Sequence, residues 1–169
     1  MKTFVLNNAR KILKEKEKIE KKLDIKIYVK GKKIEIKGTE INEYLAGWIL
    51  EALEAGFPIE DAFLLTEQDC MLEKILIKNL TKRENLTQVR ARIIGKKRKT
   101  LDLIEELSDC LITLHDNIVY IIGRTDDIKK AINAITKIIH GSKQSSVYAY
   151  LEKQRKIYHR EDLGLKDNF

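Results

Sequence analysis

The sequence has little of what disulfide-rich, membrane-spanning and zinc-binding proteins require. Its 169 residues include two cysteines, Cys70 and Cys110, which are too few and too far apart for a disulfide framework or a zinc site. No run of about 18 apolar residues is present, so no transmembrane helix is expected. The first residues lack the apolar segment of a signal peptide. We expect a cytoplasmic protein with reduced thiols, no metal, no cofactor and no membrane partner.

Charge is divided sharply along the chain, although the formal net charge is only +7. Residues 9–37 carry 12 basic and 5 acidic side chains, with lysine and glutamate interleaved as on many solvated surfaces. Residues 38–73 carry nine carboxylates and no lysine or arginine, and residues 74–100 carry ten basic side chains and one acidic. Residues 141–160 add a net +4. Concentrated positive charge is typical of nucleic-acid binding, and the six basic residues without an acid between 89 and 100 indicate it most strongly.

Hydrophobic periodicity predicts one order of elements twice: strand, helix, helix, strand, strand, helix. The first copy is degraded in its early part, and the repeat length is roughly 70 residues. The expected strands cover residues 2–6, 25–29, 34–36, 72–77, 111–115 and 118–123. The expected helices cover residues 9–23, 41–55, 59–65, 85–94, 99–109, 125–139 and 145–159.

A basic loop, Gly95-Lys96-Lys97-Arg98, lies between the two helices of the second copy. A tight turn there exposes the N–H groups that begin the next helix, and the helix dipole favours an anion. This layout is that of a KH module, whose GXXG loop clamps about four nucleotides of single-stranded RNA. The isoleucines before the glycine are expected to form the floor on which bases lie. The predicted RNA-binding residues are Arg90, Arg92, Ile93, Ile94, Gly95, Lys96, Lys97, Arg98 and Lys99.

Around this loop the sequence resembles the second KH module of the archaeal and eukaryotic Pno/Dim-two (partner of Nob) family. ARIIGKKRKT is similar to that family's R-I-I/A-G-K-x-G-K-T, and a strand-turn-strand, LITLHDNIVYIIG, follows it. IIHGSKQSSVYAYLEKQRK is similar to the family's small-residue linker, V-Y doublet and basic helix. EAGFPIEDAFLL is similar to its linker between KH modules. The resemblance is strongest from about Gly56 to Arg160.

The resemblance implies an α/β (α+β) fold with two tandem type I KH-like modules and a C-terminal helix. Each module would have a three-stranded antiparallel sheet backed by helices. The expected parts are a degenerate first module over residues 1–68, a second module over residues 69–141, and a basic helix and tail over residues 142–169. In the first module the loop position falls at residues 10–13, which contain no glycine. We expect that module to serve as a packing and partner surface.

The resemblance also implies a function in assembly of the small ribosomal subunit. The family binds the single-stranded 3′ end of small-subunit rRNA and works beside the PIN-domain endonuclease Nob, which trims that end. Archaeal relatives also engage the α subunit of translation initiation factor 2. The expected role is therefore non-catalytic, with rRNA, Nob and that factor as partners. The rival enzyme class, a nuclease or an RNA-modifying enzyme, would need clustered metal-ligating carboxylates or an activated base beside the RNA groove, and the basic segments offer none.

One departure from the family pattern leaves two interpretations open. Arg98 stands where the family has its second loop glycine. Its side chain either prevents the backbone from approaching a phosphate closely or replaces that contact with a bidentate guanidinium contact. In the first case the alternative function is a protein adaptor with weakened RNA binding, which docks a nuclease or an initiation factor.

Other candidate residues have simpler structural interpretations. The acidic segment could be imagined as a two-metal site, but its carboxylates fit the solvent face of helix 41–55 and the loop after it, where they would dock a basic partner or repel RNA. Trp48 belongs to a stripe with helical spacing, which favours the core over base stacking. Aromatic and basic residues are mixed in the last helix, and four of them are candidates for additional RNA contact: Tyr148, Lys153, Arg155 and Lys156. The carboxylates of the acidic segment that could be imagined as a two-metal site are Glu40, Glu51, Glu60, Asp61, Glu67 and Asp69.

Overall fold

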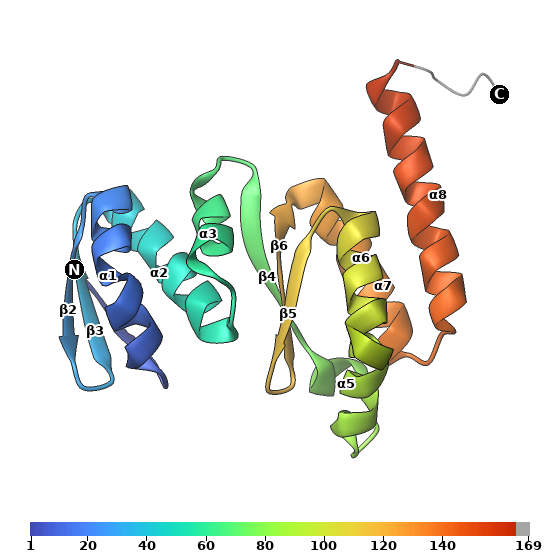
Figure 1. Ribbon diagram of the computed structural model, residues 1–169, viewed down its shortest axis with the longest axis horizontal. Helices are drawn as coiled ribbons and strands as arrows, with labels where there is room; N and C mark the ends of the chain where they lie inside the picture. The colour runs from blue at the N-terminus through green and yellow to red at the C-terminus, as the bar shows by residue number, and fades with distance from the viewer. Residues whose placement is uncertain (165–169) are drawn as a thin grey trace. The chain divides into compact units, whose positions relative to one another are not determined.

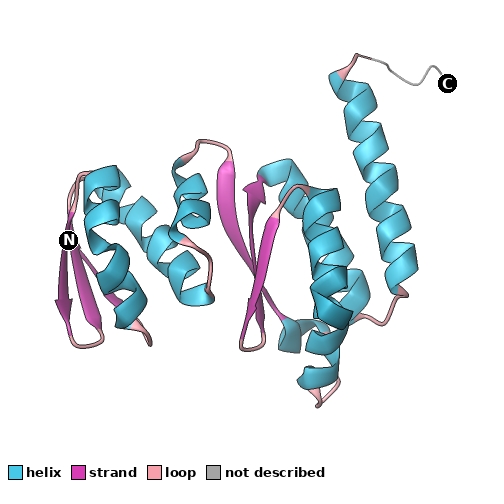
Figure 2. Ribbon diagram, viewed as in Figure 1, coloured by secondary structure: helices cyan, strands magenta, loops and turns pink. Residues whose placement is uncertain are grey.

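The computed structural model describes residues 1–164 (Figure 1). The last five residues of the expected tail, 165–169, lie outside this described part. The chain divides into two compact units, Met1–Leu72 and the residues from Glu73 onward, each with a three-stranded sheet backed by helices (Figure 2). None of the helices in the described part is long and apolar enough to span a bilayer. The fold is the mixed α/β arrangement that the sequence predicts.

The first unit is built around a sheet in the order β1-β3-β2, with antiparallel pairing on both sides of β3. Alternation in β2 and β3 turns Ile27, Ile34 and Ile36 into the core and their lysines outward. In chain order the elements are β1 (Lys2–Val5), α1 (Ala9–Leu23), β2 (Lys26–Lys30), β3 (Lys33–Lys37), α2 (Glu40–Ala55), α3 (Ile59–Ala62) and the 3-10 helix η1 (Phe63–Thr66).

Helix α1 is continuous, so the first unit has one helix where the second has two. Residues 10–13, where the loop of a KH module was expected to fall, lie inside α1. No glycine or proline interrupts this stretch, and Ile12, Ile19 and Leu23 recur on one buried face. The first unit therefore presents no loop at that position.

The apolar stripe of α2 is only partly in the core, which corrects the interpretation of its exposed half. Ile49 and Leu53 are buried as predicted, but Ile41 is 68% and Tyr44 52% exposed. Trp48 is half-buried and meets Tyr44 edge to face, with ring centroids 5.8 Å apart. These two rings and the edge strand β1 line an open pocket of about 580 Å³. The stripe is wider than the surface that covers it, so one side of it remains accessible.

The second unit has a sheet in the order β4-β6-β5, with β5 and β6 antiparallel, and the boundary between the units falls inside β4. Its two helices between the first strands are separate, as the sequence predicts, and a short helix, α4, was not anticipated. In chain order the elements are β4 (Cys70–Leu76), α4 (Ile77–Leu80), α5 (Leu86–Ile94), the 3-10 helix η2 (Lys96–Arg98), α6 (Lys99–Ser108), β5 (Leu111–His115), β6 (Ile118–Arg124), α7 (Thr125–Ile139) and α8 (Gln144–Asp162).

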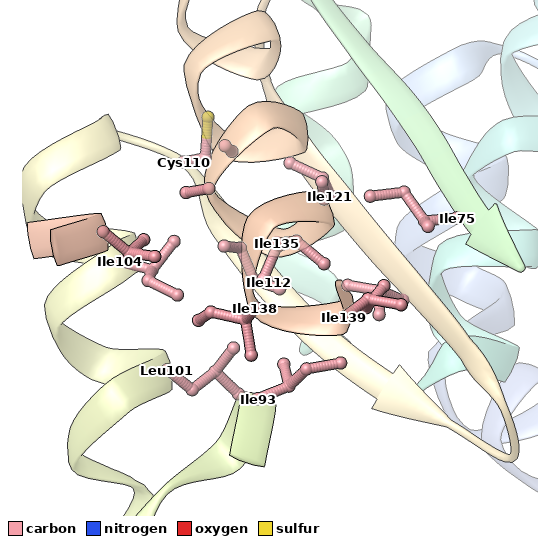
Figure 3. Close-up of a cluster of buried hydrophobic side chains, with 14 of the residues drawn as sticks. Ile75, Ile93, Leu101, Ile104, Cys110, Ile112, Ile121, Ile135, Ile138 and Ile139 are labelled. Carbon is pink, nitrogen blue, oxygen red and sulfur yellow. The ribbon is translucent and has the colours of Figure 1, made fainter. Parts of the chain in front are cut away.

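One hydrophobic cluster holds this unit together (Figure 3). It draws isoleucines from the sheet and leucines and isoleucines from α5, α6 and α7, and burying each such side chain contributes about 1.5–3 kcal/mol. Val147 and Leu151 of α8 are fully buried in the same cluster. Helix α8 packs against α6 and α7, and its later turns extend past them (Figure 1). The first turns of α8 are therefore held in a fixed position beside the α5–α6 loop.

Candidate nucleic-acid interface

Gly95 forms the corner between α5 and α6. Its φ of +74° is in the left-handed region, and its N–H donates to the carbonyl of Ala91 over 2.8 Å. A Cβ at this position would lie 2.7 Å from the Cβ and 2.8 Å from the backbone nitrogen of Thr100. Lys97 and Arg98 follow with φ of 51° and 65°. Only glycine fits both the conformation and the space at the corner.

The loop lysines are accessible to solvent. Lys96, Lys97 and Lys99 are all exposed around the corner. Arg90 is half-buried one turn earlier on α5, and its Nε is buried without a hydrogen-bond partner in residues 1–164. Three flexible cations therefore surround the loop, and a fourth cation lies about one turn earlier on α5.

The two isoleucines before the glycine have different positions. Ile94 is half-buried beside the corner and remains available to a ligand. Ile93 is 0% exposed and belongs to the hydrophobic cluster of the unit. The expectation that its side chain lies against bases is wrong, because the helical period of α5 turns that position toward the core.

Arg92 connects three segments. Its Nη1 donates to the carbonyl of Ile138 over 3.1 Å and its Nη2 to the carbonyl of Ser142 over 2.6 Å. These bonds tie α5 to the end of α7 and to the linker before α8. Because carbonyl oxygens carry no formal charge, the positive charge of Arg92 is not neutralised by them.

Arg98 is held by carboxylates instead. Its Nε donates to Asp102 over 2.7 Å, and its Nη2 lies 3.3 Å from both carboxylate oxygens of Glu105. Burial lowers the pKa of the guanidinium, but the hydrogen bond to Asp102 and the charge of Glu105 outweigh it and leave the pKa raised. Glu105 is itself fixed, since it accepts a hydrogen bond from the N–H of Ile112 in β5. A bidentate contact between Arg98 and a phosphate would have to displace these partners.

A pocket of about 540 Å³ opens on the side of the loop that faces α8. Gln144 lines it and donates from Nε2 to the carbonyl of Arg92 and to Oγ1 of Thr100, and the hydroxyl of Tyr148 donates to the same Oγ1 over 3.0 Å. Its lining residues are Arg92, Lys96, Lys99, Thr100, Lys143, Gln144, Ser145 and Tyr148. Four of these are cations and none is a carboxylate.

Tyr148 was predicted from the sequence as an additional RNA contact, but its neighbours in the linker and at the start of α8 were not. Lys143, Gln144 and Ser145 reach the loop only through packing between segments about 50 residues apart, as in the bond from Gln144 to Arg92. The available signal was the polar, small-residue run GSKQSS just before the last helix. Such a run is equally typical of an ordinary linker.

The remaining basic candidates on α8 are not brought to the loop. Lys153, Arg155 and Lys156 are exposed on its later turns, about 15–20 Å along the helix from Lys143 at the usual rise per residue. They line shallow pockets together with His159. They form a separate basic surface.

The carboxylates considered for a two-metal site do not converge. No group of three or more histidine, cysteine, aspartate or glutamate side chains within residues 1–164 is arranged to hold a metal ion. Asp61 has its pKa raised by burial and, to a smaller extent, by the neighbouring charge of Glu60. Of the six carboxylates, four are exposed and two, Glu51 and Asp61, are half-buried.

A family profile matches the chain over the site, and a curated relative matches most of the chain. The profile of the second KH domain of PNO1, a eukaryotic-type KH domain (type I), matches residues 71–156. The pre-rRNA-processing protein PNO1 of Coccidioides immitis is 32% identical over 139 residues, which cover 77% of this chain and 54% of that protein. The chain spans between about half and two thirds of the length of the curated relatives that it matches.

Solved structures match nearly the whole chain. Dim2p from Pyrococcus horikoshii has a TM-score of 0.82 and 32% identity, covering 90% of this chain and 98% of its own. A chain of the a/eIF2α–aDim2p–rRNA complex from the same organism has a TM-score of 0.83 and 30% identity, covering 92% and 94%. The similarity of this chain to these structures, in fold and in sequence, therefore extends over both units.

Proposed function

The chain belongs to the KH-domain family of PNO1 and Dim2p, and from this membership we propose that it binds single-stranded rRNA through the α5–α6 loop, without catalysing a reaction. The observation that carries the proposal is the geometry at Gly95, where a corner that only glycine can form is surrounded by Lys96, Lys97 and Lys99. Exposed cations at such a corner suit a sugar–phosphate backbone.

Within this proposal, the RNA is the 3′ end of small-subunit rRNA and the process is its maturation. Two observations support this substrate. The relatives include proteins named for pre-rRNA processing, and a structural neighbour was solved in a complex with rRNA. The finer proposal is that the chain presents this end to the endonuclease Nob and also contacts the α subunit of translation initiation factor 2, which the same complex contains.

Charge reversal at the loop tests the RNA site. Lys96→Glu combined with Lys97→Glu should lower the affinity for a 3′-end oligonucleotide at least tenfold, about 1.4 kcal/mol. Lys32→Glu with Lys33→Glu is the matched control, since these adjacent lysines are exposed on the first unit and change the net charge equally. Unchanged affinity in the loop variant, with an intact circular dichroism spectrum, would place the site elsewhere.

Salt dependence provides an independent measurement. If the loop and its neighbours neutralise about four phosphates of a single strand, log K should fall against log salt with a slope of about −3. A flat titration would contradict an electrostatic clamp. Cleavage of the oligonucleotide by the purified protein with a divalent cation would contradict the non-catalytic role.

A second candidate function, a protein adaptor with weakened RNA binding, has one observation in its favour. Arg98 occupies the glycine position and is neutralised by Asp102 and Glu105, so it adds no free charge to the loop. The adaptor would bind Nob or the initiation factor with the same affinity in wild type and in the Lys96/Lys97 variant, while the RNA oligonucleotide shows no shift. Isothermal titration with each purified partner distinguishes the two functions.

A further inference from the structure

The two arginines that flank the loop give it an asymmetric electric field. Arg92 is bonded to neutral carbonyls, whereas Arg98 is bonded to two carboxylates. At 3.6 residues per turn, Thr100 and Asp102 lie roughly 200° apart around α6. The neutralised guanidinium is therefore on one side of α6, and the side that carries Thr100 faces α8, where the charge of Arg92 is not compensated.

On this uncompensated side the pocket has two walls. One is formed by Arg92, Lys96 and Lys99, and the other by Lys143 and Ser145, with about 540 Å³ between them. Lys143 and Ser145 are exposed, while Val147 and Leu151 one and two turns later are fully buried. Core packing thus holds the second wall in place before any ligand binds, which lowers the cost of binding.

We propose that this pocket holds one backbone phosphate of the bound RNA, adjacent to the phosphates held by the loop, and that Lys143 is its contact from the second wall. The proposal rests on RNA binding through the loop, as proposed above. A phosphate suits the site because its four cations lie among hydroxyl and amide groups, and no carboxylate lines it. The Tyr148 hydroxyl is bound to Thr100, so the walls offer little for base recognition. The strand thereby passes from the loop toward the start of α8.

Removal of the Lys143 charge tests the pocket. Lys143→Ala should weaken binding of a 3′-end oligonucleotide about fivefold, as expected for loss of one charge-assisted contact. It should also make the slope of log K against log salt less steep by about 0.7, the value for one phosphate of a single strand. Lys129→Ala is the control, because Lys129 is 71% exposed on α7 and does not line the pocket. An unchanged slope in the Lys143 variant, with unchanged thermal unfolding, overturns the proposal.

A set of oligonucleotides with a single uncharged methylphosphonate linkage locates the phosphate. At one linkage, neutralisation should weaken binding of the wild-type protein about as much as Lys143→Ala does. The same linkage should have no further effect in the variant, because the charge pair is already lost. If the two changes are additive at every linkage, Lys143 contacts no phosphate of the RNA and the proposal is wrong.

These outcomes separate the two proposals. If the Lys96/Lys97 reversal abolishes binding and Lys143→Ala has no effect, the loop binds RNA and the pocket does not. If neither variant alters binding, RNA binding through the loop is wrong and the pocket proposal fails with it. Weaker RNA binding in both variants, together with a non-additive effect of Lys143→Ala and one methylphosphonate linkage, supports both proposals.

Discussion

The Nε of Arg98 donates a hydrogen bond to Oδ1 of Asp102, one turn later on α6, over 2.7 Å. This contact holds the guanidinium against the helix that follows the loop. The backbone of Arg98 has a φ of 65°, a conformation that costs an L-residue about 1–2 kcal/mol. A non-glycine residue is thus accommodated at the second glycine position with its charge directed away from the loop.

Arg98→Gly should therefore raise the RNA affinity rather than lower it, by about threefold, or roughly 0.7 kcal/mol. Glycine adopts the left-handed conformation without strain and lets a phosphate approach the backbone, and the arginine it replaces carries a neutralised charge. The salt slope should remain the same. Fluorescence anisotropy at several salt concentrations measures both. A drop in affinity would show that the guanidinium leaves its carboxylates to contact RNA.

Asp102→Asn provides the complementary change. It weakens the hold on Arg98 while leaving the backbone of the loop intact, so a released guanidinium should increase the affinity and steepen the salt slope by about 0.7. Glu105 is unsuitable for this purpose, because it also accepts a bond from the N–H of Ile112. No change in slope would mean that Glu105 alone keeps Arg98 neutralised.

Gly95→Ala should destabilise the second unit by about 2–4 kcal/mol and abolish RNA binding. The new Cβ would collide with Thr100, and the alanine backbone would have to keep a positive φ. Gly31→Ala separates the two causes, since Gly31 has a similar φ of +63° but nothing within 4 Å of the added atom. Chemical denaturation should show a loss of about 1 kcal/mol for that control. Equal losses for both variants would mean that the Thr100 side chain and backbone yield at little cost.

Thiol reactivity should separate the two cysteines. Burial raises the pKa of the Cys110 thiol to about 12, whereas Cys70 is only half-buried. At pH 8, Ellman's reagent should titrate one thiol in the native protein and two after unfolding, and no native thiol in Cys70→Ser. Fast reaction of Cys110 in the native protein would show that the core opens readily.

The same pKa predicts an alkaline limit to stability. The unfolded chain ionises its thiol near pH 9, whereas the folded chain keeps Cys110 protonated until about pH 12. The contribution of this group is therefore intact below pH 9 and is lost as the pH rises toward 12. Cys110→Ala should reduce the alkaline slope of the unfolding midpoint. An identical slope in the variant would assign the alkaline loss to other groups.

The emission of Trp48, the single tryptophan, should not respond to the oligonucleotide. All residues of the proposed RNA site belong to the second unit, whereas Trp48 lies half-buried on α2 of the first unit beside Tyr44. A titration that saturates the loop should leave the emission unchanged. Quenching that persists in the Lys96/Lys97 variant would show that bases stack on the exposed half of the α2 stripe.

Most elements of the fold could be predicted because their signals are local. The period of apolar residues in α1, α6 and α7 matches the buried faces in the structure. The α2 stripe shows the limit of this reasoning. Periodicity reveals which residues share a face, but not how much of that face its neighbours cover, so the exposure of Ile41 and Tyr44 could not be seen.

The residues of the candidate site that are adjacent in sequence could be predicted, whereas the contacts that tertiary packing brings to the loop could not. Gly95 and its lysines are adjacent in sequence, so their chemistry could be recognised from the chain alone. The bonds of Arg92 depend on distant partners, the carbonyls of Ile138 and Ser142. The neutralisation of Arg98 combines a near partner, Asp102, with Glu105, which a bond to β5 holds in place.

The burial of Val147 and Leu151 determines how this chain can be divided into fragments. A cut after Gly141, where the small-residue linker begins, would remove both from the core and forfeit about 3–6 kcal/mol. That loss is comparable to the whole folding free energy of many small domains. A recombinant fragment that is meant to fold by itself should therefore keep the residues up to about 156, where the family match also ends.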